Sequence, residues 1–286
     1  MIFFMKKCLI GGQAVIEGVL MKNDNNVAIA VRRPNKQIAL KKTKMHPLSK
    51  KLKFLAWPFF RGTVNLVETL VMGIDALNYS ASQAVEGEDE KISKSEFAFT
   101  TILAVVIAVG IFIILPLYLT KLTKTTGVMF NLIDGVIRIA LFLIYILAIS
   151  AMKDVRRLFQ YHGAEHKTVN CYESGEKITP ANVKKYSTLH RRCGTTFLLI
   201  VFVISIIVFS FVTSDKMWVK FVSRILLLPV IAGVSYEILK LGAKYPHNFL
   251  LNILVYPGLG LQKITTREPD KRQIEVAIKA FNAVVK

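Results

Sequence analysis

Long apolar stretches that alternate with basic segments are the dominant pattern along this chain of 286 residues. Stretches 97–119 and 196–212 reach or approach the roughly 18 consecutive apolar residues that a transmembrane helix requires. Stretches 128–152 and 221–241 are also apolar, although each contains a few polar or charged residues placed mainly toward its ends. The pattern therefore predicts a mainly α-helical membrane protein with four transmembrane helices.

Lysine and arginine are unevenly distributed between these stretches. Residues 1–96 contain 15 of them, residues 153–195 contain nine and the tail after 241 contains seven, whereas 120–127 and 213–220 contain two each. Because Lys and Arg are retained on the cytoplasmic side of a membrane, we expect both termini and the central segment to be cytoplasmic. This arrangement requires an even number of spans, which agrees with four.

A small antiparallel β-meander is predicted at the N-terminus. Residues 11–21, 27–33 and 37–43 alternate between apolar and polar, and polar turns separate them. So small a sheet has too little area to be stable alone, and we expect it to pack on the other cytoplasmic parts. Glu17 lies in the first predicted strand, where it either points to solvent or contributes an acid to a site.

Two amphipathic segments flank the spans. Apolar residues recur every three or four positions in 54–81, which indicates an amphipathic helix that lies at the membrane interface or caps the bundle. An acidic stretch at 86–90 links it to the first span. After the fourth span, 246–261 is apolar but interrupted by Pro257-Gly258, which predicts an interfacial segment that does not cross the bilayer. A final amphipathic helix is expected to pack on the sheet. The predicted divisions are 1–53, 54–96, 97–152, 153–195, 196–241 and 242–286.

Composition and charge agree with a membrane protein that has basic cytoplasmic parts. The chain is 53% hydrophobic, yet it carries 38 Lys and Arg against 19 Asp and Glu, a formal net charge of +19. Attraction to anionic lipids is worth about 1 kcal/mol per basic residue near the surface. The dense run of lysines from 41 to 53 suits phosphates of lipid or RNA. Because no aromatic-interleaved RNA motif accompanies it, we expect no nucleic-acid partner other than ribosomal RNA.

The three cysteines and the first residues carry further expectations. Cys8, Cys171 and Cys193 all fall in segments assigned to the reducing cytoplasm, so no structural disulfide is expected. The N-terminal residues lack the apolar core of a signal peptide. We therefore expect no cleavage, with translation starting at Met1 or at Met5.

The segment His162-Gly163-Ala164-Glu165-His166 follows the first pair of predicted spans and has the spacing of a metal site. On a helix, residues at i and i+4 lie one turn apart, so His162 and His166 can share one ion. Glu165 then lies beside them as a base or a partner of the ligands. The order is the inverse of the commoner zinc-protease motif. A buried cluster of hydrogen-bonded histidines has the same sequence, so the motif alone leaves both interpretations open.

Additional ligand types surround this motif. Three of the five histidines lie between 153 and 195, together with Cys171, Glu173, His190 and Cys193. His190 and Cys193 are three residues apart and form a candidate ligand pair, although His190 also suits phosphate binding and Cys193 also suits the core at the edge of a span. Glu237, near the end of the fourth span, requires a partner at that depth.

Basic residues near the same surface are candidate contacts for lipid headgroups. Such contacts are expected from Arg156, Arg157, Arg191 and Arg192. Within the second span, Asp134 and Arg138 are separated by one helical turn and are expected to form a structural ion pair, with Arg138 also able to meet a lipid phosphate.

Five short strings resemble the bacterial YqhQ-like family over nearly the whole chain. They are GGQAVIEGV (11–19), YHGAEHKT (161–168), YSTLH (186–190), RCGT (192–195) and TREPD (266–270). The family is a domain of unknown function described as predicted metal-dependent enzymes, so the resemblance implies a metal, a multi-pass protein of the bacterial cytoplasmic membrane, and no named reaction. Its motifs match this chain at His162, Glu165, His166, His190, Cys193 and Glu17. Arg191 stands where the family pattern is expected to have proline.

Three functions are consistent with these observations. The first is a membrane metalloenzyme that binds a divalent ion, with zinc as the favoured metal. His162 and His166 would be two ligands, and the third would be His190, Cys193, Glu173 or Glu237. Glu165 would move the proton while a peptide or lipid-linked ester is hydrolysed. The second is a noncatalytic scaffold or membrane-protein biogenesis factor that binds a partner protein, a second copy, anionic lipid or ribosomal RNA. A transporter ranks third, because few intramembrane polar residues are present.

Overall fold

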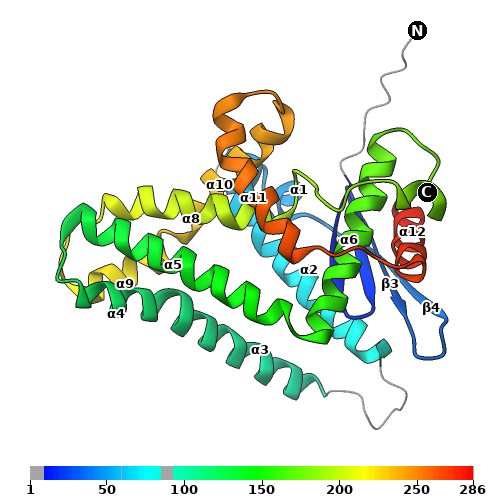
Figure 1. Cartoon of the computed structure of the whole chain (residues 1–286), viewed down its shortest axis with the longest axis horizontal. Helices are drawn as coiled ribbons and strands as arrows, with labels where there is room; N and C mark the ends of the chain where they lie inside the picture. The colour runs from blue at the N-terminus through cyan, green and yellow to red at the C-terminus, as the bar shows by residue number, and fades with distance from the viewer. Residues whose placement is uncertain (1–9, 59, 85–92, 286) are drawn as a thin grey trace.

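The computed structural model of the protein describes residues 10–58, 60–84 and 93–285 (Figure 1). The fold is mainly helical, with one small sheet near the N-terminus. The strands are β1 (Ile10–Val15), β2 (Gly18–Asn23), β3 (Asn26–Arg32) and β4 (Ile38–Lys44). The predicted acidic linker at 86–90, Cys8 and both possible start residues lie outside the described residues.

The other regular elements of the described chain are helices. They are α1 (Leu48–Lys51), η1 (Lys53–Ala56), α2 (Phe60–Ala84), α3 (Lys94–Val109), η2 (Gly110–Ile114), α4 (Leu115–Leu122), α5 (Gly127–Ser150), α6 (Lys153–Glu173), α7 (Pro180–Lys184), α8 (Gly194–Ser210), α9 (Met217–Leu226), α10 (Leu228–Lys244), α11 (Phe249–Thr265) and α12 (Lys271–Val285). The predicted amphipathic helix at 54–81 is confirmed as α2, although it begins at Phe60.

The sheet is antiparallel in the order β1-β2-β3-β4, which confirms the predicted meander. The prediction of one strand over 11–21 is wrong, because this stretch folds back on itself between Val15 and Gly18. Glu17 occupies the turn with a φ of +53°, in the left-handed region. The turn residues Ile16 and Glu17 are not among the residues that usually signal a turn, so the sequence pattern concealed it.

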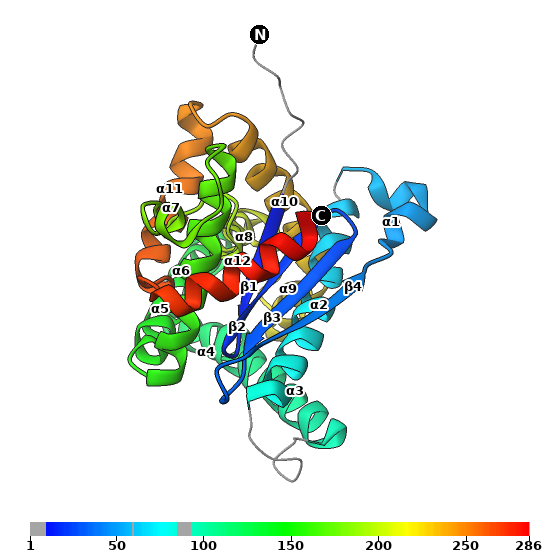
Figure 2. The same ribbon diagram turned by 90° about the vertical axis from the view of Figure 1, so that its right-hand side faces the viewer.

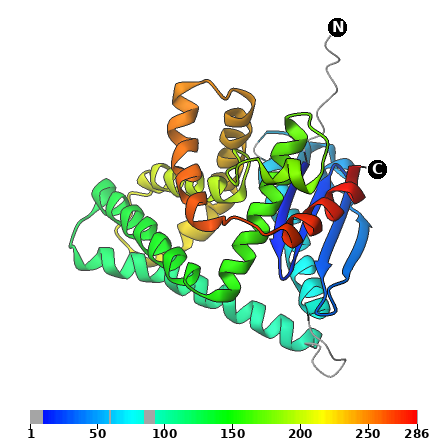
Figure 3. The same cartoon turned by 45° about the vertical axis from the view of Figure 1, so that its right-hand side comes forward.

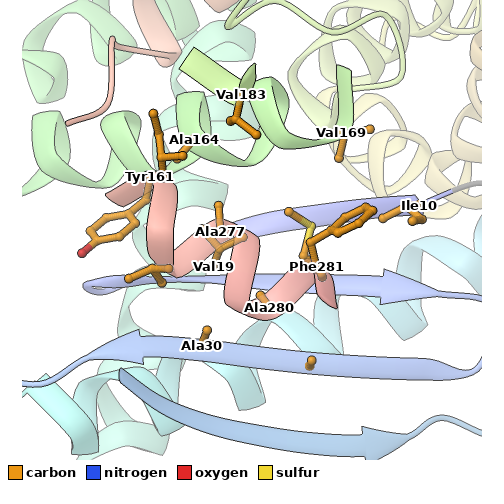
Figure 4. Close-up of a cluster of buried hydrophobic side chains, with 14 of the residues drawn as sticks. Ile10, Val19, Ala30, Tyr161, Ala164, Val169, Val183, Ala277, Ala280 and Phe281 are labelled. Carbon is orange, nitrogen blue, oxygen red and sulfur yellow. The ribbon is translucent and has the colours of Figure 1, made fainter. Parts of the chain in front are cut away.

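Helices cover both faces of the sheet (Figure 2). On one face, Val27, Ile29 and Val31 of β3 pack on Ala76 of α2. On the other, small residues let α12 approach closely, as Ala30 of β3 lies against Ala277 and Ala280 (Figure 4). Packing of the C-terminal helix on the sheet is therefore confirmed. The same core includes Tyr161 and Ala164, so it fixes α6 against the sheet.

Among the described residues, two helical stretches are long and apolar enough to cross a membrane, Ser95–Leu122 and Gly127–Ser150. Helices α9 and α10 would form a third span if they cross together, with a bend of 47° between them. Helix α8 is also apolar but has only 17 residues. The loop between α4 and α5 points away from the sheet (Figure 3). Together, these helices indicate that the protein associates with a membrane.

The predicted interruption at Pro257-Gly258 is wrong, because α11 continues through Pro257 as one helix. A Cβ added at Gly258 would lie 2.6 Å from Cα of Thr196, so the glycine lets α11 lie close to α8. Close packing of α8 and α11 holds two polar residues next to α6. They are Thr265 at the end of α11 and Cys193 at the start of α8.

Candidate metal centre

Three potential metal ligands converge where α6 meets the start of α8. His162 and His166 lie on one face of α6, with ring centroids 4.4 Å apart. Cys193 caps the N-terminus of α8, and its Sγ lies 3.2 Å from Nε2 of His162. One ligand atom from each of the three residues lies within 4.8 Å of the others. The helical spacing predicted for the two histidines is present, and the fold adds Cys193 to them.

Hydrogen bonds fix the tautomer of both imidazoles. Nδ1 of His162 lies 2.8 Å from the carbonyl oxygen of Thr265, and Nδ1 of His166 lies 2.5 Å from that of Thr188. A carbonyl oxygen can only accept, so each Nδ1 must donate. In a neutral imidazole, Nε2 then carries the lone pair, as in most metal-binding histidines. Two imidazole nitrogens and one thiolate form a donor set that suits zinc.

Burial keeps His166 in the neutral form that a metal ligand needs. His166 is 1% exposed, and this burial lowers the pKa of its imidazole. Hydrogen bonds to Cys193 and to the carbonyl of Thr188 act in the opposite direction, but burial outweighs them. His162 is only half-buried. His166 is therefore enclosed by the protein, and His162 lies nearer to solvent.

Glu165 is buried beside the three ligands. Its Oε2 lies 3.6 Å from Nε2 of His166. Burial raises the pKa of the Glu165 carboxyl, although the charges of His162, His190 and Arg192 oppose the rise. A raised pKa favours the protonated carboxyl group, and such a shift is one way in which a carboxyl group is adapted to act as a general acid or base.

Gly12 in β1 makes room for this carboxylate. A Cβ at position 12 would lie 2.8 Å from Cγ of Glu165 and 2.6 Å from the carbonyl oxygen of Leu20. At Gly163, a Cβ would lie 2.1 Å from the carbonyl oxygen of Arg267. Both glycines therefore allow backbone to approach the face of α6 that carries the site.

His190 lies next to the three ligands but outside their group. Its ring centroid is 5.6 Å from that of His166, and its Nε2 is 3.4 Å from Oε2 of Glu173. Burial by itself would raise the pKa of Glu173, but His190 and Arg192 outweigh it and lower that pKa. Gln262 binds the backbone N–H and carbonyl of His190, each at 2.8 Å. This clamp orders the segment that supplies the Thr188 carbonyl.

The other predicted acids lie elsewhere. Glu237 forms an ion pair with Arg61 of α2, with Oε1 at 2.6 Å from Nε. Glu17 pairs with Arg157 and accepts a hydrogen bond from the hydroxyl of Tyr161 at 3.2 Å. The structure therefore does not bring either carboxylate to the three ligands.

The arginines predicted to bind headgroups have different surroundings. Arg156 is exposed. Arg191 donates to Asn252, and Arg192 pairs with Glu173. Arg157 is occupied by Glu17. Of the four, Arg156 and Arg157 are exposed, and Arg191 and Arg192 are partly buried.

Sequence reasoning missed the residues that support the ligands. These are Gly12, Gly163, Thr188, Gln262 and Thr265. Which backbone carbonyl accepts a hydrogen bond, and which position has room only for glycine, depends on tertiary contacts. Neither leaves a periodic pattern in the sequence, so pattern analysis could not find these residues. The resemblance strings gave a signal, because segments 11–19, 161–168, 186–190, 192–195 and 266–270 all meet around this site.

An apolar groove with a volume of about 360 Å³ runs between α5, α8 and α11. Its lining includes Ile139, Leu143, Leu199, Val203, Leu261 and Ile264. Ile264 immediately precedes Thr265, whose carbonyl binds His162. The groove therefore runs along the helix that ends at the candidate metal centre.

Comparisons with known proteins agree with the resemblance seen in the sequence. A family model described as a protein of unknown function, DUF1385, matches residues 57–286. The chain is 35% identical to the uncharacterized protein YqhQ of Bacillus subtilis (strain 168), over 96% of this chain and 92% of that protein. No solved structure matches. The resemblance to the YqhQ-like family is therefore confirmed.

Proposed function

This chain belongs to the DUF1385 family of proteins of unknown function, and we propose that it is a metal-dependent membrane hydrolase. The observation that carries the proposal is the convergence of His162, His166 and Cys193, with ligand atoms within 4.8 Å of one another. The tautomers set by the Thr265 and Thr188 carbonyls support it, because they leave the lone pair of each Nε2 available to an ion.

The ligands would be Nε2 of each histidine and the thiolate of Cys193. When bound, a divalent ion such as zinc supplies the acidity that makes water a nucleophile near neutral pH. Glu165 accepts the proton of the attacking water at its carboxylate and delivers it to the leaving group. Its burial, which favours the protonated carboxyl, suits the second of these steps.

We further propose that the protein spans the bacterial cytoplasmic membrane four times. Helix α8 and the bent pair α9–α10 would add to the two longer spans, and the distribution of lysine and arginine supports cytoplasmic termini. The candidate metal centre would then face the cytoplasm, next to the membrane surface.

Between a peptide and a lipid-linked substrate, the apolar groove favours the lipid. Its wall contains Leu261 and Ile264, one turn or less from Thr265. An acyl or prenyl chain in this groove would place a polar linkage near His162. A peptide would have to leave its backbone unsatisfied in the same apolar space.

A second candidate is a scaffold that binds an anionic partner, and the exposed lysines of β4 favour it. Lys41, Lys42 and Lys44 are all exposed on this strand. Anionic lipid, an acidic protein or ribosomal RNA would suit this strand. Reversing these three charges would abolish function under the scaffold proposal and leave hydrolysis by the enzyme intact.

The test uses full-length protein loaded with zinc in nanodiscs and incubated with bacterial lipid extract or with a peptide library. We expect mass spectrometry to detect hydrolysis products that E165Q does not form, although this variant binds as much zinc as the wild type. E176Q is the matched control, since Glu176 is a nearby exposed glutamate. Equal product from E165Q, or no zinc-dependent product from either mixture, would refute the enzyme.

A further inference from the structure

A second cluster of charged residues is buried at the opposite end of the bundle. It consists of Asp134 and Arg138 on α5 and of Lys220 and Arg224 on α9. Asp134, Lys220 and Arg224 are each only 1% exposed. Asp134 lies 16 residues before the end of α5 at Ser150, or about 24 Å along the helix. The cluster is therefore separate from the candidate metal centre.

The two guanidinium groups converge on one carboxylate oxygen. Oδ2 of Asp134 accepts from Arg138 at 2.7 Å and from Arg224 at 3.0 Å. Both guanidiniums also lie over the ring of Phe209, 5.3 and 4.5 Å from its centroid. The predicted Asp134–Arg138 ion pair is present, and Arg224 donates to the same oxygen of Asp134. The other oxygen, Oδ1, accepts no hydrogen bond from the described residues.

Lys220 is the least satisfied member. Its Nζ lies 4.0 Å from the ring centroid of Phe130 and makes no hydrogen bond within the described part of the chain. Its ion pair is with Asp215, 3.8 Å away, whose side chain is 64% exposed. Nε of Arg138 and Nε of Arg224 also lack partners among the described residues, as does Oδ1 of Asp134.

The cluster thus contains three cations and one buried carboxylate. Burying a charge is costly unless it is paired and hydrogen-bonded, and this cost is highest next to the hydrocarbon of a membrane. A purely structural pair would need only Asp134 and one arginine. The surplus positive charge and the unpartnered nitrogen atoms indicate that an anion completes the cluster.

We propose that this cluster binds a phosphate group, carried by a lipid headgroup or free in solution. Guanidinium and ammonium groups together favour a tetrahedral anion with several acceptor oxygens. The exposed side chain of Asp215 marks the route, and the phosphate replaces Asp215 as the partner of Lys220. Asp215 and phosphate therefore compete for the same ammonium group.

Because Asp215 and phosphate compete for Lys220, substitutions of Lys220 and of Asp215 should change phosphate affinity in opposite directions. K220M keeps the length of the side chain and removes the charge, so it weakens phosphate binding about tenfold or more. D215N removes the competing carboxylate and strengthens binding. K216M, at a neighbouring exposed lysine, binds as the wild type does. The variant H162A/H166A also binds as the wild type, which separates this site from the proposed enzyme.

The experiment titrates detergent-purified full-length protein with phosphatidylglycerol, with diacylglycerol as the tail without phosphate, and with inorganic phosphate. Bound lipid is measured by native mass spectrometry, and affinity by the shift in unfolding temperature. Binding of phosphatidylglycerol alone identifies a headgroup site, and binding of inorganic phosphate as well identifies a site for any phosphate. Both results support the proposal if K220M weakens binding. Wild-type affinity in a folded K220M overturns the proposal. If K220M does not fold, D215N decides, and an affinity for phosphate equal to that of the wild type overturns the proposal.

Discussion

Burial makes Glu165 hold its proton more tightly than an exposed glutamate does, and the pKa of its carboxyl group is raised. Folding therefore favours the protonated form, and the wild-type protein loses stability as pH rises above about 4.5, the ordinary pKa of the group. Glutamine at this position cannot ionise, so the E165Q variant does not lose stability in this way as pH rises.

We accordingly expect E165Q, freed of metal with a chelator, to be more stable than the wild type at pH 7, with the difference shrinking as pH falls to 4.5. Unfolding temperatures in detergent across this range measure the effect. E176Q should show no such trend. A difference between E165Q and wild type that does not depend on pH would contradict the pKa argument.

Gly12 offers a steric test of the same region. G12A places a methyl group 2.8 Å from Cγ of Glu165 and 2.6 Å from the carbonyl oxygen of Leu20, so we expect a loss of about 1–3 kcal/mol in the free energy of unfolding. G11A is the matched control, because nothing lies within 4 Å of a Cβ there. Equal stability of the two variants would show that β1 does not lie so close to α6.

At the residue scale, the sequence predicted the ligands better than their supports. Helical spacing brought His162, Glu165 and His166 together, and Cys193 was among the candidate third ligands. The choice between Cys193, His190, Glu173 and Glu237 depended on how α8 meets α6, which is a tertiary contact. No local pattern encodes it.

Among the elements, α2 and α10 are joined by a polar contact that the sequence concealed. Arg61 and Glu237 are 176 positions apart, and their side chains are 29% and 20% exposed. The depth of Glu237 indicated that it needs a partner, and the sequence offered a metal ion as one candidate. The fold selects Arg61.

This pairing predicts the behaviour of E237Q. We expect the variant to lose stability by about 1 kcal/mol, and to lose little more when R61Q is added, because the two substitutions remove the same interaction. Its metal content should equal that of the wild type. Loss of metal in E237Q would instead make Glu237 a ligand and contradict the pairing.

Strand boundaries were the least predictable element features. Residues 11–21 alternate only weakly, and the turn at Glu17 uses a residue that is uncommon at positive φ. The helix through Pro257 shows the converse case, since packing on α8 maintains a helix that local propensity opposes. In both cases tertiary contacts overrode the local signal.

For the molecule as a whole, apolar length and basic charge predicted membrane association, and alternation and amphipathicity predicted the meander with its covering helix. They could not predict that α2 covers the second face of the sheet. Amphipathicity shows that a helix has an apolar face, but not which surface that face meets.

Four spans with cytoplasmic termini lead to a labelling prediction. In intact cells, a membrane-impermeant maleimide should modify T213C, in the loop between α8 and α9, and should not modify S174C, after α6. Thr213 and Ser174 are both exposed. Permeabilised cells provide the control, in which both variants react. Labelling of S174C in intact cells would contradict the proposed orientation.

The central claim is that His162, His166 and Cys193 hold a metal ion, and metal content tests it most directly. Inductively coupled plasma mass spectrometry would be applied to detergent-purified wild type, to H162A/H166A and C193S, and to H46A/H247A, which removes two exposed histidines. We predict about one equivalent of a transition metal in the wild type and in H46A/H247A, and its loss from the other two variants while they remain folded. Wild-type protein without metal, or metal retained in both folded site variants, would contradict the account.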